Sequence, residues 1–206
     1  MKFKEHNLAH RWCRGTGLEI GAAAHNPFGL NARNVATYDP FYEKAQIELC
    51  GEAAPIDVEA YADRIPLEDA SQDFILSSHV VEHLPDLIGA LVEWNRLLKS
   101  GGICFIIHPL RYALSGDESR PLTPLEHYID DYGNRYDRNT HPLQGVTGGA
   151  GGHYHVAEIE NLIEVVDFTN SRDLTDWELV DLERVDTKVG NGFTLVFRKQ
   201  EHSRQP

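Results

Sequence analysis

The residues best suited to acid–base chemistry in this chain are histidines, of which the sequence holds eleven. Imidazole titrates near neutral pH, so it can take a proton from a substrate that must lose one. Three positions are candidate catalytic residues: His79, His108 and His155. His79 and His108 close two strongly apolar segments, and His155 forms an H-x-H pair with His153. We therefore expect a general base among His79, His108 and His155.

The same part of the sequence permits a second interpretation, a divalent metal site. Neutral imidazoles at strand ends suit zinc, iron or nickel, and an H-x-H pair supplies two ligands. The candidate ligands are His79, His108, His153 and His155. No helical H-x-x-x-H pair with a nearby third ligand is evident from the sequence, so metal binding stays an alternative beside loop or capping roles for most histidines.

A second group of residues has the types and spacing of a nucleoside-binding turn. Gly21, Ala22 and two further alanines follow an apolar segment, and small residues there let the backbone pass close beneath a cofactor. Asp39 lies 20 residues beyond Glu19, where an acid can accept hydrogen bonds from two ribose hydroxyls. Glu19, inside an apolar segment, is expected to bind backbone or a cofactor amino group. Because the full G-x-G-x-x-G pattern is absent, the turn alone also fits a tight strand exit.

Alternating strands and helices must position these residues. The apolar patterns predict seven strands, at 17–21, 35–39, 56–60, 73–78, 102–108, 177–186 and 193–198. They predict helices at 7–13, 85–99, 124–132 and 157–168. The run 102–108 is typical of a central strand covered on both faces, and the turn 190–192 predicts a closing hairpin. The expected fold is α/β: a doubly wound, Rossmann-like seven-stranded sheet, mostly parallel with a reversed C-terminal strand and helices on both faces.

Length and composition limit the function further. The 206 residues fit a single domain, 1–206, with a lid or substrate-binding insertion at about 110–155. A net charge of -13 disfavours a nucleic-acid partner. No apolar run is long enough to span a membrane and no secretory signal is evident, so we expect a cytoplasmic protein without a membrane partner. The expected acceptor is a small molecule or glycan, and a homodimer is left open.

Four segments appear in an order that resembles a known family. They read L-E-I-G from Leu18, A-D-R-I-P from Ala62, Q-D-F-I-L through V-V-E-H-L over 72–84, and R-L-L-K-S-G-G from Arg96. The class I S-adenosylmethionine-dependent methyltransferases, especially the small bacterial type 11 group, carry runs like D-A-E-x-L-P, S-F-D-x-V, V-x-E-H-L and R-x-L-K-P-G-G. The resemblance covers about Leu18 to Pro109.

The resemblance implies S-adenosylmethionine as cofactor and methyl transfer to an O or N atom of a small molecule or sugar. It implies an adenosine lying across the strand ends, with Asp39 on the ribose, Ala62 and Asp63 at the adenine, and His79 toward the methyl group. The cofactor-binding residues are then Glu19, Gly21, Ala22, Asp39, Ala62, Asp63, Ser78 and His79.

The sequence departs from the family pattern at two places. Tyr61 stands where the family usually has an acid for the adenine amino group, and Ala22 replaces part of the glycine turn. Two other functions stay open: a metal-dependent enzyme using the histidine cluster on the same scaffold, and a binding protein for S-adenosylmethionine or S-adenosylhomocysteine without catalysis.

Overall fold

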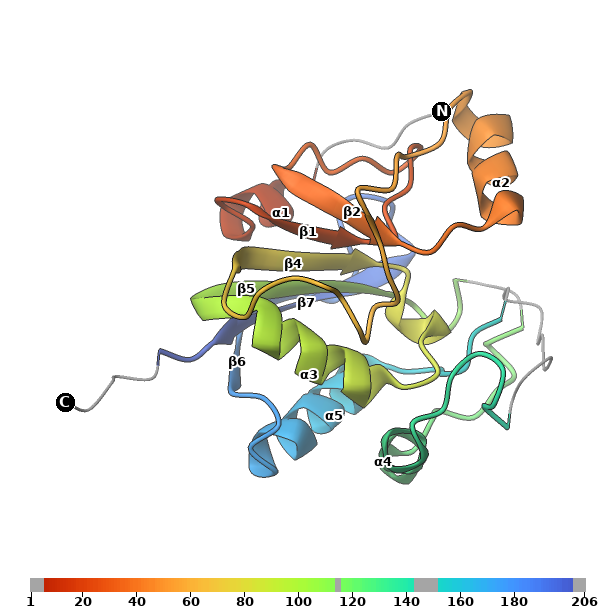
Figure 1. The fold of residues 1–206 in the computed structure, drawn as a ribbon. Coiled ribbons are helices and arrows are strands. Elements are labelled where there is room, and N and C mark those ends of the chain that lie inside the picture. Colours follow the sequence, from red (N-terminus) through yellow and green to blue (C-terminus); the bar gives the residue numbers. More distant parts are fainter. Residues whose placement is uncertain (1–5, 114–115, 143–151, 202–206) are drawn as a thin grey trace.

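The computed structural model describes residues 6–113, 116–142 and 152–201. Its centre is one seven-stranded sheet with the order β3-β2-β1-β4-β5-β7-β6 (Figure 1). The strands are β1 (Gly17–Ile20), β2 (Ala32–Ala36), β3 (Val58–Glu59), β4 (Gln72–Ser78), β5 (Leu98–Pro109), β6 (Trp177–Glu183) and β7 (Gly192–Lys199). Strands β1 to β5 pair in parallel, and β7 runs antiparallel to β5 and β6. The predicted mostly parallel sheet with a reversed C-terminal strand is confirmed.

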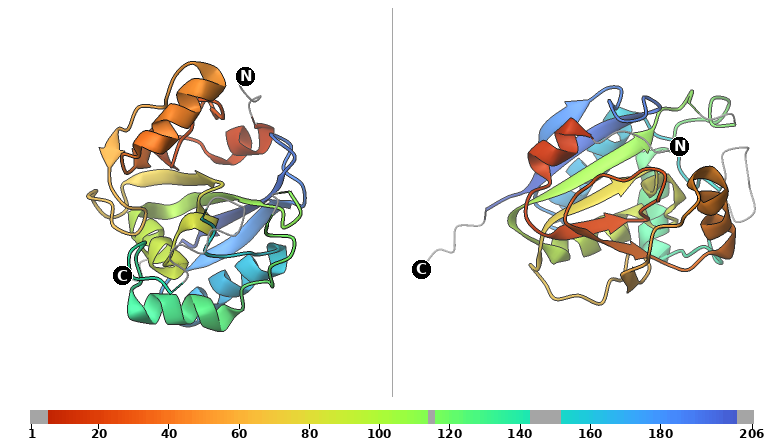
Figure 2. Two further views of the ribbon diagram at one scale, coloured as in Figure 1. Left: turned by 90° about the vertical axis from the view of Figure 1, so that its right-hand side faces the viewer. Right: turned by 90° about the horizontal axis from the view of Figure 1, so that it is seen from above.

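Helices cover both faces of this sheet (Figure 2). They are α1 (Asn7–Trp12), α2 (Pro40–Cys50), the short 3-10 helix η1 (Val81–His83), α3 (Leu87–Leu97), α4 (Leu125–Asn134) and α5 (Ile159–Ser171). On one face α3 and α5 pack on the larger core, in which Trp94 of α3 is fully buried. On the other face α1 contributes Ala9 to a second core with Phe74 and Phe105. Two buried layers explain why the segments 74–76 of β4 and 103–107 of β5 are continuously apolar.

The second strand and the helix after it differ from the expectation. The prediction of a strand at 35–39 is wrong at both ends, because β2 spans Ala32–Ala36 and Asp39 lies beyond it. The Asp39 carboxylate instead accepts hydrogen bonds from the backbone N–H groups of Phe41 and Tyr42, and Pro40 is the first residue of α2. Aspartate at the N-cap followed by proline is a strong helix start. The sequence analysis did not predict α2.

The loop between β6 and β7 is organised by one buried carboxylate. Asp186 is 2% exposed and accepts hydrogen bonds from the backbone N–H groups of Lys188, Val189, Gly190 and Gly192. Strand β6 therefore ends at Glu183, and the prediction that it runs to Asp186 is wrong, because the Asp186 side chain is committed to the loop.

The same loop also contacts two segments that are distant in the sequence. The Nζ atom of Lys188 donates to the carbonyl oxygen of Pro27 at 2.6 Å, in the loop after β1. The carbonyl of Asn191 accepts from the N–H of Leu110, where the expected insertion begins. The C-terminal hairpin thus joins the first turn of the sheet to the segment after β5.

Within the expected insertion, α4 (Leu125–Asn134) confirms the helix predicted at 124–132. The glycine-rich stretch of the insertion, 145–152, lies almost wholly outside the described residues. Cys13, Cys50 and Cys104 are free thiols. Among the described residues, none of the helices combines the length and apolar character needed to cross a bilayer.

Candidate active site

The turn after β1 lies where the order of strands reverses. Chain connections lead outward from β1 to β2 on one side and from β4 to β5 on the other, and ligands of such sheets bind outside the strand ends at this point. Gly21 begins the turn with a φ of +67°, and a Cβ atom there would lie 2.9 Å from Cγ2 of Val80. The backbone of this turn therefore lies closer to the segment after β4 than a side chain at Gly21 would allow.

Side chains from neighbouring elements hold this turn in place. The N–H of Ala22 donates to Oδ1 of Asn34 at 2.9 Å, and the N–H of Ala24 donates to Oε1 of Gln46 at 2.7 Å. Asn26 donates through Nδ2 to Oγ of Ser78, which joins the turn to the end of β4. The Oδ1 atom of Asn26 is buried without a hydrogen-bond partner among the described residues. We call Glu19, Gly21, Ala22, Asn26 and Ser78 the cradle.

Glu19 carries the negative charge of the cradle. It lies in β1 between Asn34 of β2 and Leu76 of β4. Burial raises the pKa of Glu19 to about 7, and the nearby charge of Lys188 opposes this shift. A carboxylate in such surroundings is stabilised further by a cationic ligand.

The residues expected around the adenosine are more exposed. Asp39 and Asp63 are exposed, and Tyr61 has an exposed fraction of 56%. The carbonyl of Ala62 accepts a hydrogen bond from Nε1 of Trp94 at 2.9 Å, which fixes this segment on α3. Their contacts with ribose and adenine stay predictions.

Beyond the C-terminal end of β4, three imidazoles surround the buried carboxyl group of Glu82. Oε1 of Glu82 lies 3.8 Å from Nδ1 of His79, 4.0 Å from Nε2 of His83 and 3.9 Å from Nε2 of His153. We call these four residues the Glu82 group. Nδ1 of His153 is bonded to Oδ2 of Asp117 at 2.6 Å, so a second carboxylate orients that ring.

The Glu82 group joins buried and accessible side chains. Glu82 is 1% exposed, and burial raises its pKa to about 8. Burial also lowers the pKa of His79 below its ordinary value and that of His83 to about 4, so both rings are neutral at neutral pH. His79 keeps 23% of its side chain exposed and has a φ of +55°, in the left-handed region that is uncommon for residues other than glycine.

The other two predicted catalytic histidines are buried. His108 is 3% exposed, bonds through Nδ1 to the carbonyl of Pro109, and stacks on Phe193. Burial lowers its pKa to about 3. His155 is 1% exposed and lies 2.9 Å from Asp131. The four sequence-predicted metal ligands are thus divided: His79 and His153 adjoin Glu82, His155 adjoins Asp131, and His108 lies at the end of β5.

Comparison with known proteins finds similarity to methyltransferases. A family model described as a methyltransferase domain matches residues 13–106. A protein of Mycolicibacterium smegmatis named "Probable S-adenosylmethionine-dependent methyltransferase" is 37% identical over 125 residues, which are 57% of this chain and 47% of that protein. Residues 13–106 are thus similar to a class I S-adenosylmethionine-dependent methyltransferase domain. The chain spans about half the length of the curated relative that it matches.

The solved structure of a S-adenosylmethionine-dependent methyltransferase from Methanosarcina mazei has the same fold. Its TM-score is 0.55 at 16% identity, and the match covers 95% of this chain and 98% of that one. S-adenosylmethionine is the cofactor of the family, and the cradle fits it. Gly21 permits close backbone approach, Oδ1 of Asn26 is an unpartnered acceptor, and Glu19 offers a carboxylate to a cationic group.

Several residues of this candidate site were not predicted from the sequence. Asn26, Asn34 and Gln46 support the turn through side-chain hydrogen bonds between distant segments, which no local pattern reveals. Asp117 had only its place in the expected insertion as a signal. Glu82 was visible as part of V-x-E-H-L, but its burial among imidazoles was not.

Substitutions distinguish two roles of Asp39, the expected hydrogen bond to the cofactor ribose and the N-cap of α2. Asparagine caps helices as well as aspartate, so Asp39→Asn is expected to keep the free energy of unfolding while weakening S-adenosylhomocysteine binding about tenfold, through loss of a charge-assisted bond to the ribose. Asp39→Ala is expected to weaken binding equally and to lower the free energy of unfolding by about 1 kcal/mol. Calorimetric titration and urea denaturation measure the two effects. Wild-type affinity in Asp39→Asn would leave Asp39 as a helix cap only.

Proposed function

We propose that this methyltransferase transfers a methyl group from S-adenosylmethionine to an O or N atom of a small-molecule or sugar acceptor. The observation that carries the proposal is the position of His79, a partly exposed neutral imidazole directly after Ser78, which is bonded to the cofactor turn through Asn26. A proton acceptor therefore adjoins the cradle.

The residues divide between binding and proton removal. The cofactor supplies an activated methyl group, and its transfer is an in-line displacement in which positioning provides most of the rate. Gly21 and Ala22 shape the binding surface, and Glu19 and Asn26 offer acceptors to it. His79 takes the proton that an acceptor hydroxyl or amine must lose. Glu82, 3.8 Å from Nδ1 of His79, stabilises the imidazolium that results once its own carboxyl group is ionised.

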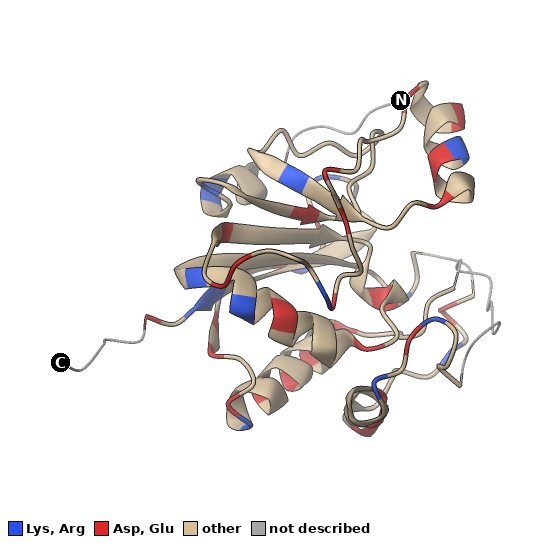
Figure 3. Ribbon diagram, viewed as in Figure 1, with Lys and Arg blue, Asp and Glu red and all other residues tan. Residues whose placement is uncertain are grey.

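The charge of the protein supports a small acceptor. The net charge is -13, and acidic residues are spread over α2, α3 and α5 (Figure 3). A phosphate backbone approaching these surfaces is repelled. Near the insertion, Arg111 and Tyr112 supply a cation and an aromatic ring, with Tyr112 72% exposed. An acceptor with an anionic or aromatic group fits such side chains.

The test is turnover with a defined acceptor panel. Formation of S-adenosylhomocysteine is measured with methyl-labelled S-adenosylmethionine and a panel of sugars, phenols and amines, and mass spectrometry locates the added methyl group. His79→Asn keeps a residue that tolerates the positive φ, so the fold is preserved. We expect kcat to fall about 100-fold or more while the Kd for S-adenosylhomocysteine changes less than about threefold.

His10→Asn in α1 is the matched control, because α1 lies at the opposite end of the strands (Figure 1). It is expected to retain wild-type turnover. Unchanged kcat in His79→Asn would show that His79 is not the base. Tight cofactor binding without turnover on any acceptor of the panel would instead favour a binding protein without catalysis.

A further inference from the structure

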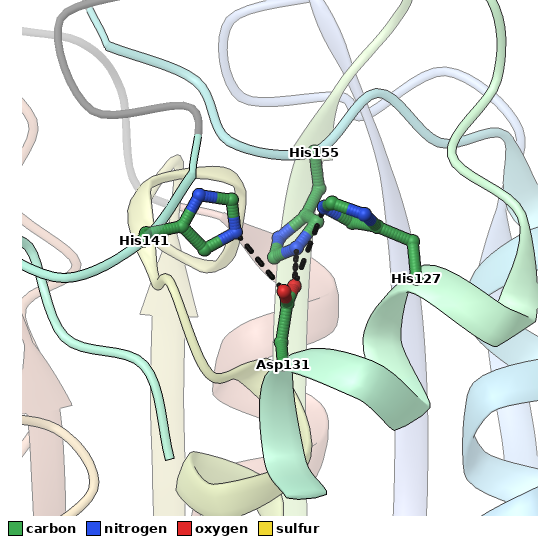
Figure 4. Close-up of side chains that lie close together, drawn as sticks. All are labelled: His127, Asp131, His141 and His155. Atoms are coloured by element: carbon green, nitrogen blue, oxygen red, sulfur yellow. Dashed lines mark hydrogen bonds and ion pairs between the residues drawn. The ribbon is translucent and has the colours of Figure 1, made fainter. Parts of the chain in front are cut away.

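We propose that His127, Asp131, His141 and His155 form a structural zinc site that fastens the segments on either side of the 143–151 stretch to α4. The four side chains converge on one point (Figure 4). His127 and Asp131 lie one turn apart on α4, His141 follows that helix, and His155 precedes α5. The site is distinct from the Glu82 group and does not depend on methyl transfer.

The distances between the donor atoms match a tetrahedral metal site. The Nε2 atom of each imidazole faces the Asp131 carboxylate: His155 at 2.9 Å, His141 at 3.1 Å and His127 at 3.4 Å. Zinc binds imidazole nitrogen and carboxylate oxygen at about 2.0–2.2 Å, so the ligand atoms of a zinc tetrahedron lie about 3.4 Å apart. One atom from each of the four residues can therefore reach a common ion with small movements.

Burial and charge favour a cation at this point. Asp131 and His155 are 1% exposed and the side chain of His141 has no exposed surface. A carboxylate among three imidazoles carries one negative charge when the rings are neutral, and a buried charge needs a partner or a metal. Of the three ring contacts with Asp131, that of His155 is a hydrogen bond. A divalent cation takes the place of a proton on the Nε2 atom of each ring.

The donor set selects the class of metal and its role. Three imidazole nitrogens and one carboxylate oxygen suit zinc or a similar transition metal, whereas magnesium and calcium prefer oxygen ligands. Four protein ligands complete the coordination shell, which is the arrangement of a structural site without an open position. The rings of Tyr128 and Tyr154 pack against His155 and His141 and hold their orientation.

The site would also position part of the Glu82 group. His155 lies two residues after His153, whose Nε2 is 3.9 Å from Glu82. The N–H groups of Tyr154 and His155 both donate to the carbonyl of Glu82. An ion held by His155 therefore fixes the short segment that brings His153 to the catalytic side.

Metal binding is tested on the full chain without reference to activity. The purified protein is analysed for metal content, stripped with a chelator, and titrated with Zn²⁺ and with Co²⁺, whose visible absorption is intense only in tetrahedral sites. We expect one equivalent of Zn²⁺ per chain and a tetrahedral Co²⁺ spectrum. X-ray absorption of the zinc-loaded wild type, which needs no substitution to fold, is expected to show a nitrogen and oxygen shell with imidazole scattering.

Two substitutions assign the site. Asp131→Asn preserves shape and removes the charge, and His127→Ala truncates the most exposed of the four residues, 28% exposed, so the fold is least disturbed. Both are expected to abolish stoichiometric metal binding while retaining stabilisation by S-adenosylhomocysteine. The matched control is His83→Ala, which removes a ligand from the neighbouring Glu82 group and is expected to retain the metal.

The proposal is overturned by any of three results. These are no Zn²⁺ or Co²⁺ binding by the wild type, full binding by both Asp131→Asn and His127→Ala, or loss of the metal in His83→Ala alone. The last result would place the ion at the Glu82 group. Because cofactor binding is measured separately, a failure of the methyltransferase proposal leaves these outcomes interpretable.

Discussion

Gly21→Ala is expected to weaken S-adenosylhomocysteine binding by more than about tenfold, or more than about 1.4 kcal/mol. The substituted residue must keep a φ of +67°, which disfavours any L side chain by about 1–2 kcal/mol. Its Cβ would also lie 2.9 Å from Cγ2 of Val80, so the turn or the segment after β4 has to move. Either movement changes the surface of the cradle. Isothermal titration calorimetry measures the affinity, and urea denaturation measures the stability.

Gly51→Ala is the matched control for this prediction. Gly51 ends α2 with a φ of +87°, and a Cβ atom there meets nothing within 4 Å. It therefore carries the same conformational penalty without the contact and outside the cradle. We expect both variants to lose stability and only Gly21→Ala to lose affinity. Equal affinities in the two variants would contradict the assignment of the cofactor site to this turn.

Glu19→Gln is expected to stabilise the cofactor-free protein at pH 8 and to weaken its binding of S-adenosylmethionine. The pKa of Glu19 is raised by burial from 4.5 to about 7, so between these values the folded chain holds a proton that the unfolded chain has released. The free energy of unfolding then falls as pH rises through this window and levels off above about pH 7, by an amount on the order of 3 kcal/mol. Glutamine does not titrate, so Glu19→Gln is expected to avoid this fall in the free energy of unfolding.

Ionisation of Glu19 also affects the binding of S-adenosylmethionine. Because S-adenosylmethionine carries positive charges, its affinity is expected to increase from pH 6 to pH 8 as Glu19 ionises, and Glu19→Gln is expected to flatten that increase. Urea denaturation at several pH values and calorimetric titration measure both effects, with the exposed Glu48→Gln as control. A pH dependence of stability that is identical in the wild type and Glu19→Gln would exclude Glu19 as its source.

Burial on both faces made the central strands β4 and β5 predictable from the sequence. Strand β2, near one edge of the sheet, was harder to predict. The segments 74–76 of β4 and 103–107 of β5 are apolar throughout, because one face packs on α3 and α5 and the other on α1. Strand β2 has no such signal, since it exposes Arg33 and buries Asn34, which is held by hydrogen bonds to other segments. Helix α2 exposes Phe41, Ile47 and Leu49, so it lacks an apolar stripe. Only its Asp-Pro start was visible locally.

The part of the candidate site that lies at the ends of predicted strands could be predicted from the sequence. Gly21 follows β1 and Ser78 ends β4, and these two strands pair in parallel, so their proximity followed from the topology. The histidines were recognised, but their partners Glu82 and Asp131 come from segments that only tertiary structure brings together. For the proposed zinc site, the four-residue spacing of His127 and Asp131 on a predicted helix was a local sign beside the H-x-H pair of His153 and His155.

The C-terminal hairpin has a consequence for synthesis of the chain. Strand β5 pairs on one side with β7, and the loop held by Asp186 sends Lys188 back to Pro27. A nascent chain that has emerged only as far as the family-matched region 13–106 therefore has an unpaired edge at β5 and lacks Lys188 beside Glu19. The cofactor-binding half is therefore completed only after the β6–β7 hairpin has emerged.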